Sequence, residues 1–283
     1  MSETSFFEQQ DGSKIAYKIL KSANAKNEVP LVMIIGLSTT KEQFYGFEKE
    51  LAKYQQVIVF DNRGIGESTV ASPNDPMTLE LLAQDTIGLI KHLGIKKFNL
   101  LGEAMGARIG VLLSLKLSSD LKLEKLIIIN SAPRIDTNSK VVQAVEALYE
   151  SSTFSLPKTV QEQKDEFLKG ERDPILAKYL LEHPDKLEQI AEITVNLAPR
   201  RPLEIMKRQW EANKSCDLTP RLKEIQTPTL IIHGESNTTV PIENAEIFNR
   251  EIPNSVLIKV PNAGHSVFIT SPEIANKINE FCN

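Results

Sequence analysis

The sequence Gly102-Glu103-Ala104-Met105-Gly106 joins an apolar run to a helix-forming segment. The residues ahead of it, Phe98–Leu101, predict a short strand, and Met105–Leu117 has the apolar spacing of a helix. Small residues at both ends of this five-residue segment allow a strand and a helix to pack closely across a tight turn. The sequence therefore predicts a sharp strand-to-helix turn with Ala104 at its tip.

On both sides of this turn, short apolar strands alternate with amphipathic helices. Near-continuous apolar runs such as Leu31–Ile35 are typical of parallel strands buried on both faces. The alternation predicts an α/β protein with a mostly parallel, doubly wound sheet. The expected strands are Phe6–Gln9, Ile15–Leu20, Leu31–Ile35, Val57–Phe60, Phe98–Leu101, Leu126–Asn130, Thr229–Ile232 and Val256–Val260. The expected helices are Phe44–Tyr54, Leu79–Leu93, Met105–Leu117, Ile242–Glu251 and Pro272–Phe281.

Residues 133–225 interrupt the alternation with a purely helical segment that prolines divide into short pieces. A helical insert in such a sheet is expected to cover the carboxyl ends of the strands, where open α/β sheets bind ligands. The predicted organisation is a core of residues 1–132 and 226–283 with an inserted helical cap of residues 133–225. The helices expected in the cap are Val141–Tyr149, Val160–Leu168, Ile175–Leu181, Leu187–Leu197 and Leu203–Ala212.

The composition is that of an ordinary globular protein. The chain has 283 residues, 25% of them charged, and its net charge of -4 gives no reason to expect nucleic acid or an anionic membrane as a partner. The first residues, Met1–Ser5, lack the apolar stretch of a signal peptide, and no apolar run is long enough to span a bilayer. Cys216 and Cys282 are expected to be free, reduced thiols of a cytoplasmic protein. The four histidines do not cluster at ligand spacing, so no metal or other cofactor is expected.

Four further motifs each follow a predicted strand. They are Ile35-Gly36-Leu37-Ser38, Asp61-Asn62-Arg63-Gly64-Ile65-Gly66-Glu67-Ser68, His233-Gly234-Glu235-Ser236-Asn237-Thr238-Thr239-Val240-Pro241 and Asn262-Ala263-Gly264-His265-Ser266. With the turn at Ala104, they span nearly the whole chain, and in this order they resemble the motifs of the α/β-hydrolase superfamily. Within that superfamily, the chain resembles the capped esterase, lactonase and C–C-hydrolase type. The resemblance implies the α/β-hydrolase fold with an inserted helical cap.

The resemblance also assigns the catalytic positions to particular residues. The backbone N–H groups of Leu37 and Met105 correspond to an oxyanion hole, and His265 corresponds to the catalytic histidine. The nucleophile position is held by Ala104 and the position of the triad acid by Asn237. Alanine has no atom that attacks a carbonyl carbon. The amide of Asn237 is expected to orient the ring of His265 by accepting a hydrogen bond from Nδ1–H, without the charge that stabilises an imidazolium.

Other polar residues of these motifs are expected to be structural. Glu103 stands beside the nucleophile position, but its side chain is expected to point away from the site. Asp61 and Arg63 are expected to tie their turn together, and His233 is expected to pack in the core.

With two catalytic groups missing, the preferred hypothesis is a non-hydrolytic protein that binds a small apolar ligand under the cap. An ester, lactone or terpenoid-like molecule is expected, since alanine and an amide leave the cavity less charged. The candidate wall residues are Tyr149, Phe154, Met206 and Trp210. One alternative is that both changes were introduced to inactivate an esterase or lactonase that has serine at position 104 and aspartate at position 237. Another is a lyase or isomerase that uses His265 as a lone general base.

Overall fold

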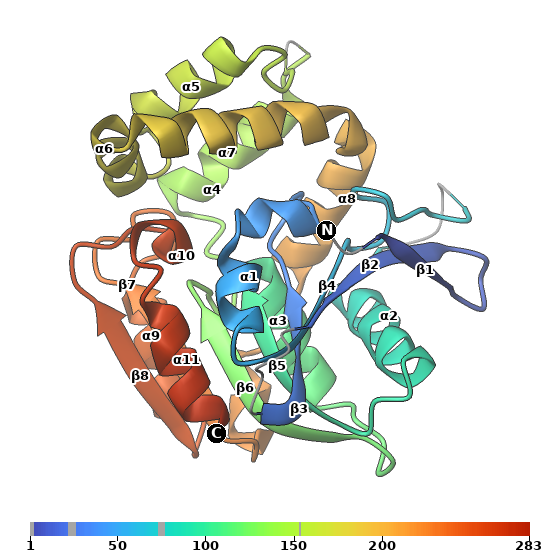
Figure 1. Ribbon diagram of the computed structural model, residues 1–283. Helices are drawn as coiled ribbons and strands as arrows, with labels where there is room; N and C mark the ends of the chain where they lie inside the picture. The colour runs from blue at the N-terminus through green and yellow to red at the C-terminus, as the bar shows by residue number, and fades with distance from the viewer. Residues whose placement is uncertain (1–2, 22–26, 73–76, 153) are drawn as a thin grey trace.

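The computed structural model describes residues 3–21, 27–72, 77–152 and 154–283. Its strands are β1 (Ser5–Glu8), β2 (Lys14–Leu20), β3 (Asn27–Ile34), β4 (Gln55–Phe60), β5 (Lys97–Glu103), β6 (Lys122–Ile129), β7 (Thr229–Gly234) and β8 (Ser255–Val260). They form one sheet in the order β1-β2-β4-β3-β5-β6-β7-β8 (Figure 1). Only the pairs β1–β2 and β2–β4 are antiparallel, and the other neighbours are parallel. The predicted α/β fold class with a mostly parallel sheet is confirmed.

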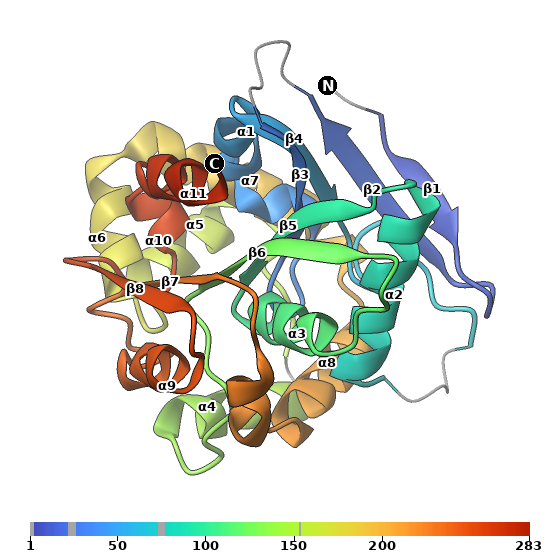
Figure 2. The same cartoon turned by 90° about the horizontal axis from the view of Figure 1, so that it is seen from below.

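Helices cover both faces of the sheet (Figure 2). One face carries α2 (Leu79–His92), α3 (Met105–Ser114) and α9 (Glu243–Glu251), and the other carries α1 (Phe47–Ala52), α10 (Val267–Thr270) and α11 (Ile274–Cys282). Because alternate residues of a strand point to opposite faces, Leu100 of β5 packs on the α3 side and Leu101 on the α1 side. The sheet is therefore buried on both faces, as the continuous apolar runs predict.

The segment Phe44–Tyr54, predicted as one helix, is broken in the structure. The segment contains a 3₁₀ turn, η1 (Lys41–Phe44), and then α1, which begins only at Phe47. Between them, Tyr45 and Gly46 have φ angles of 51° and 98°, in the left-handed region that glycine adopts freely. The apolar spacing continues through this break, so the spacing alone does not locate it.

A group of helices lies beyond the carboxyl ends of the parallel strands (Figure 1). It consists of α4 (Lys140–Glu150), α5 (Val160–Lys169), α6 (Pro174–Glu182) and α7 (Pro184–Leu197). From there, η2 (Ala198–Arg200) and α8 (Leu203–Ser215) return the chain to α2 and α3, and η3 (Thr219–Glu224) precedes β7. Buried Arg108 links α3 to α8, because its guanidinium donates to the Asn213 carbonyl oxygen at 2.6 Å. The division of the chain at residues 133 and 225 stays a prediction.

The turn after β4 is held by a buried ion pair, in keeping with its expected structural role. Arg63 donates from Nε to Asp85 on α2 at 2.8 Å, and its Nη1 contacts Asp11 and Ser13 in the turn between β1 and β2. The Arg63 side chain is 4% exposed, so this pair is shielded from water. The turn is thereby tied to both the hairpin and α2.

Among the described segments, every helix falls short of the length and apolar character needed to cross a membrane. The same ranges contain no group of three His, Cys, Asp or Glu side chains arranged as a metal site. Met1 and Ser2 of the N-terminal segment lie outside the described residues.

Candidate functional site

Ala104 lies at the tip of a strained turn between β5 and α3. Its φ and ψ angles are 49° and -115°, which cost an L-residue on the order of 1–3 kcal/mol. The turn is tight because a Cβ on Gly102 would lie 2.3 Å from Ala107 Cα, and one on Gly106 would lie 2.1 Å from the Ile34 carbonyl oxygen. The two glycines therefore permit the contact that the sequence predicts, and Ala104 stands where that contact forces positive φ.

His265 and Asn237 meet from loops that follow β8 and β7. The Nδ2 atom of Asn237 lies 3.2 Å from Nδ1 of His265. The Oδ1 atom of Asn237 accepts hydrogen bonds from the backbone N–H groups of Thr239 at 3.0 Å and Val240 at 2.9 Å. Those two donors fix which way the amide is turned, so its NH2 group faces the imidazole ring.

The expected direction of the Asn237–His265 hydrogen bond is wrong. Because the Asn237 carbonyl oxygen is engaged by two backbone N–H groups, the side chain donates to Nδ1 of His265 rather than accepting from it. A neutral imidazole that accepts at Nδ1 carries its hydrogen on Nε2. The Nε2 atom, which faces the turn, is therefore a donor and has no lone pair free to take a proton.

The expectation that Glu103 points away from the site is also wrong. Its Oε1 atom lies 3.6 Å from Nε2 of His265, and its Oε2 atom lies 2.5 Å from the place where a Cβ on Gly36 would be. Strand alternation explains this direction, since Glu103 shares a face of β5 with Leu101. Leu101 packs in the same buried cluster as Ala263 and Val267, which flank His265. Counting alternate residues forward along β5 from Leu101 to Glu103 is the sequence signal that finds this contact.

Burial decides the charges of the two facing groups. Burial raises the pKa of Glu103 to about 8, against the opposing hydrogen bond from the Gly36 N–H. Burial lowers the pKa of His265 to about 4, although the Asp173 carboxylate pulls the pKa of the ring upward. At neutral pH the site therefore contains a carboxylic acid and a neutral imidazole.

The loop after β3 and the turn after β5 each present one of the backbone donors expected at an oxyanion hole. Among the described residues, the N–H groups of Leu37 and Met105 donate to no protein acceptor. The next residue, Ser38, has a φ of 58° and is held from α8, because its N–H donates to Gln209 Oε1 at 2.9 Å. Its carbonyl oxygen accepts from Nε of Arg201 at 2.6 Å. Neither Gln209 nor Arg201 carries a sequence signal, since each reaches this loop from more than 160 residues away.

The residue that precedes α6 also contacts the loop of His265 directly. Asp173 precedes α6 and accepts at Oδ2 from the Ser266 N–H at 2.7 Å, while its Oδ1 accepts from the Leu176 N–H at 3.1 Å. A Cβ on Gly264 would lie 2.1 Å from Asp173 Oδ1, so glycine is needed for this approach. The carboxylate of Asp173 thus joins the start of α6 to the loop that positions His265.

The four candidate wall residues gather beside the Leu37 loop. The ring of Tyr149 lies 5.8 Å from that of Phe154 and 6.4 Å from that of Trp210, and its hydroxyl lies 3.4 Å from Ser38 Oγ. Phe154 and Met206 border a cavity of about 380 Å³ between α7 and α8, which we term the cap cavity. All four share one hydrophobic cluster with Leu37 and Met105. That they contact a ligand stays a prediction.

Two other features lie apart from this site. His233 is fully buried and its Nε2 bonds the Val240 carbonyl at 2.8 Å, which is the expected structural arrangement.

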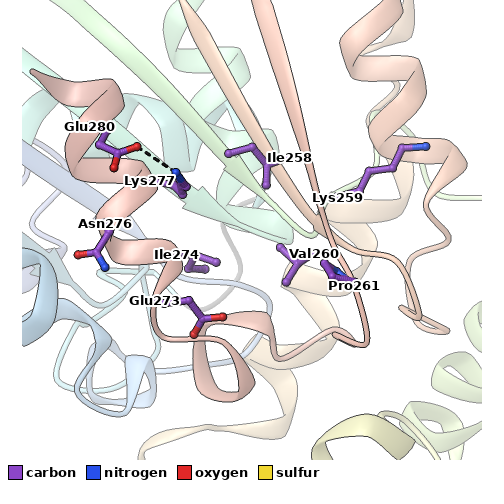
Figure 3. A pocket seen from close by; sticks show the side chains of 9 residues that line it. All are labelled: Ile258, Lys259, Val260, Pro261, Glu273, Ile274, Asn276, Lys277 and Glu280. Carbon is purple, nitrogen blue, oxygen red and sulfur yellow. Dashed lines mark hydrogen bonds and ion pairs between the residues drawn. The ribbon is translucent and has the colours of Figure 1, made fainter.

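A second hollow of about 380 Å³ lies between β8 and α11 at the edge of the sheet (Figure 3). Its rim includes the ion pair of Lys277 and Glu280, at 3.2 Å, and none of the predicted site residues.

Comparisons with known proteins agree with this fold. Residues 29–272 match the family model described as alpha/beta hydrolase fold. The chain is 25% identical over 235 residues to a protein named putative carbamate hydrolase RutD from Caulobacter segnis, and the match covers 81% of each chain. It is 26% identical over 248 residues to a protein of the same name from Cronobacter turicensis, and that match covers 88% of each chain. Among solved structures, it is similar to an enol-lactonase from Burkholderia xenovorans, with a TM-score of 0.77 and 24% identity over 98% of this chain and 99% of that one. It is also similar to a hydrolase from Pseudomonas aeruginosa, with a TM-score of 0.78 and 22% identity over 99% and 98% of the two chains.

The Asn237→Asp substitution is predicted to move the imidazole hydrogen from Nε2 to Nδ1 and to raise the pKa of His265 by about 1–3 units. The new carboxylate keeps the two backbone hydrogen bonds and turns an acceptor, with a negative charge, toward Nδ1. Long-range ¹⁵N–¹H NMR spectra of the ring, recorded across a pH titration, report both changes.

The matched control is Asn249→Asp, which adds the same charge on exposed α9 and should leave His265 unchanged. A spectrum of the unsubstituted protein that already shows the hydrogen on Nδ1 would contradict the assigned direction of the Asn237 bond.

Proposed function

The chain belongs to the α/β-hydrolase fold family, and from that premise we propose that it binds a small carbonyl-containing molecule under its cap without hydrolysing it through a covalent intermediate. The observation that carries the proposal is the amide orientation of Asn237, which places the hydrogen of His265 on Nε2. Ala104 removes the nucleophile, and Asn237 removes the base.

The magnitudes favour a catalytically silent site. In the serine-protease template, replacing the triad acid by its amide costs about 10⁴ in kcat because the histidine adopts the wrong tautomer. The same tautomer is expected here for His265, and Ala104 offers no atom to form an acyl intermediate. The groups of a catalytic triad act as a unit, so the rate losses from removing two of them do not add, and either change alone is enough to silence the site.

The remaining polar groups suit a hydrogen-bond acceptor on the ligand. The N–H groups of Leu37 and Met105 and the Nε2–H of His265 are donors without protein acceptors within hydrogen-bond distance among the described residues. A carbonyl or lactone oxygen would satisfy them, and its apolar body would lie against the wall residues. The carbamate hydrolases and the enol-lactonase that resemble this chain are named for carbonyl compounds, which supports the same class of ligand.

Thermal-shift measurements with esters, lactones and terpenoid ketones test the binding. A ligand at 100 times its Kd is expected to raise the Tm by about 5 °C or more. Met206→Trp is expected to abolish the shift by filling the cap cavity, whereas Val256→Trp on an exposed strand position should not. A panel in which no compound shifts the Tm would overturn the proposal.

The double substitution Ala104→Ser with Asn237→Asp tests the silence. The unsubstituted protein is expected to show no turnover of p-nitrophenyl acetate above background, and the double variant to gain at least about 10³-fold if the cavity still fits an ester. Turnover by the unsubstituted protein would contradict catalytic silence. Activity confined to the double variant is expected both of a silent binding protein and of an inactivated ester or lactone hydrolase, and serine and aspartate codons at positions 104 and 237 of the source gene would establish the latter.

One observation favours a second candidate, non-hydrolytic proton transfer of a lyase or isomerase. Glu103 faces His265 at 3.6 Å, and its pKa of about 8 suits a group that exchanges protons near neutral pH. In this reading Glu103 rather than His265 is the base, because Nε2 of His265 already carries a hydrogen. An enolate would be held by the N–H groups of Leu37 and Met105.

Exchange of α-protons of bound ketones with deuterium oxide, followed by NMR, tests this candidate. The rate is expected to rise through the Glu103 pKa, since the carboxylate is the active form, and Glu103→Gln should abolish it. Glu235→Gln, on an exposed side chain of the loop after β7, is the control. Absence of exchange in the unsubstituted protein at pH 9 would leave ligand binding alone.

A further inference from the structure

Arg201 lies where the cap cavity meets the loop of Leu37 and Ser38. It follows η2, immediately before α8, and its side chain borders the cavity. Its Nε donates to the Ser38 carbonyl oxygen at 2.6 Å. The cavity and the predicted ligand site therefore share one side chain.

The charge of Arg201 has no acidic partner. Among the described residues, no carboxylate lies within 4.0 Å of its guanidinium, and its electrostatic neighbours are the hydroxyls of Tyr45 and Tyr149 and a second cation, Arg172. Burial lowers the pKa of Arg201, and no carboxylate is present among its described neighbours to offset the lost hydration of the charge. By contrast, the buried guanidinium of Arg63 is paired with two carboxylates. Arg201 is half-buried, and a partly desolvated cation without a nearby carboxylate favours binding of an anion beside it.

The cavity around Arg201 has the composition of a site for an amphiphilic anion. Its lining is mostly apolar, contributed by side chains such as Leu156, Val195, Leu203 and Met206. Among the described residues that line it, the charged side chains are Arg201 and Lys158, and none is acidic. At about 380 Å³, the volume is in the range of small-molecule sites.

Unused donors point to the same kind of ligand. Of the five N–H bonds of the Arg201 guanidinium, only the one on Nε has a protein acceptor among the described residues, and the outer fork has none in that part of the chain. Gln209, fully buried on the other side of Ser38, uses Oε1 for the Ser38 N–H, and its Nε2 has no partner in the described part of the chain. A planar fork with free parallel N–H bonds matches a carboxylate better than any neutral group.

We propose that the cap cavity receives a small organic acid, whose carboxylate pairs with the outer fork of Arg201 and whose apolar body lies against Leu203 and Met206. The inference rests on the proposed function, in which the cap covers a ligand, and it adds a negative charge at a defined end of that ligand. Since Arg201 also holds the Ser38 carbonyl oxygen, an occupying carboxylate lies one residue from the Leu37 donor. The ligand is thus an acid with a carbonyl or apolar body rather than a neutral ester.

Isothermal titration with octanoate and octanamide tests the proposal, because the two probes share a chain and differ in charge. Octanoate is expected to bind at least about 10-fold more tightly than octanamide, as a charged hydrogen-bonded pair requires. The Arg201→Gln variant should lose that preference, and Arg201→Lys should retain part of it. Arg200→Gln is the matched control, since the Arg200 side chain is 48% exposed and pairs with Glu67 outside the cavity. Acetate, which has the charge but no chain, should bind far more weakly than octanoate.

The outcomes separate this proposal from the proposed function. If octanamide binds as tightly as octanoate, or if only neutral esters and lactones bind, the carboxylate assignment is overturned and the ligand-binding function remains. If neither probe nor any compound of the ester, lactone and terpenoid panel binds, the proposed function itself fails. Should Arg201→Gln not fold, the octanoate–octanamide ratio on the unsubstituted protein, with Arg201→Lys, still decides.

Discussion

The backbone contact between β5, α3 and β3 at Gly102 and Gly106 determines the geometry of the whole site. With no room for a Cβ at either glycine, the chain must turn sharply, and Ala104 is held at positive φ. The same turn leaves the Met105 N–H without an acceptor in the described part of the chain and directs Glu103 toward His265. None of these consequences depends on whether the residue at the tip is reactive. A scaffold shaped for nucleophilic chemistry can therefore persist around an alanine.

The hydrogen bonds at Asn237 show how one atom changes the character of such a site. Backbone donors from Thr239 and Val240 engage the same oxygen that a carboxylate would offer them. The remaining atom is a donor in the amide and an acceptor in an acid, so it decides which ring nitrogen of His265 carries the hydrogen. A proton-accepting site thus becomes a donor site with little change in shape. The neutral imidazole and the protonated Glu103 fit that change, since burial disfavours charge on both.

The helical segment between β6 and β7 is hydrogen-bonded to the loops of Leu37 and His265. Gln209 and Arg201 hold both backbone groups of Ser38, beside Leu37, while Asp173 holds the loop of His265. A ligand that engaged Arg201, as we propose, would therefore contact the side chain that holds the loop of Leu37.

Local patterns in the sequence were enough to predict the parallel sheet and the turn with Ala104 at its tip, because apolar periodicity and glycine placement are short-range properties. The order of the motifs was enough to name Asn237 and His265. Only the tertiary structure decided the direction of their hydrogen bond and the orientation of Glu103, and only there does Arg201 prove to lack an acidic partner. These properties depend on which groups meet across loops distant in sequence, and on which hydrogen bonds those groups have already made.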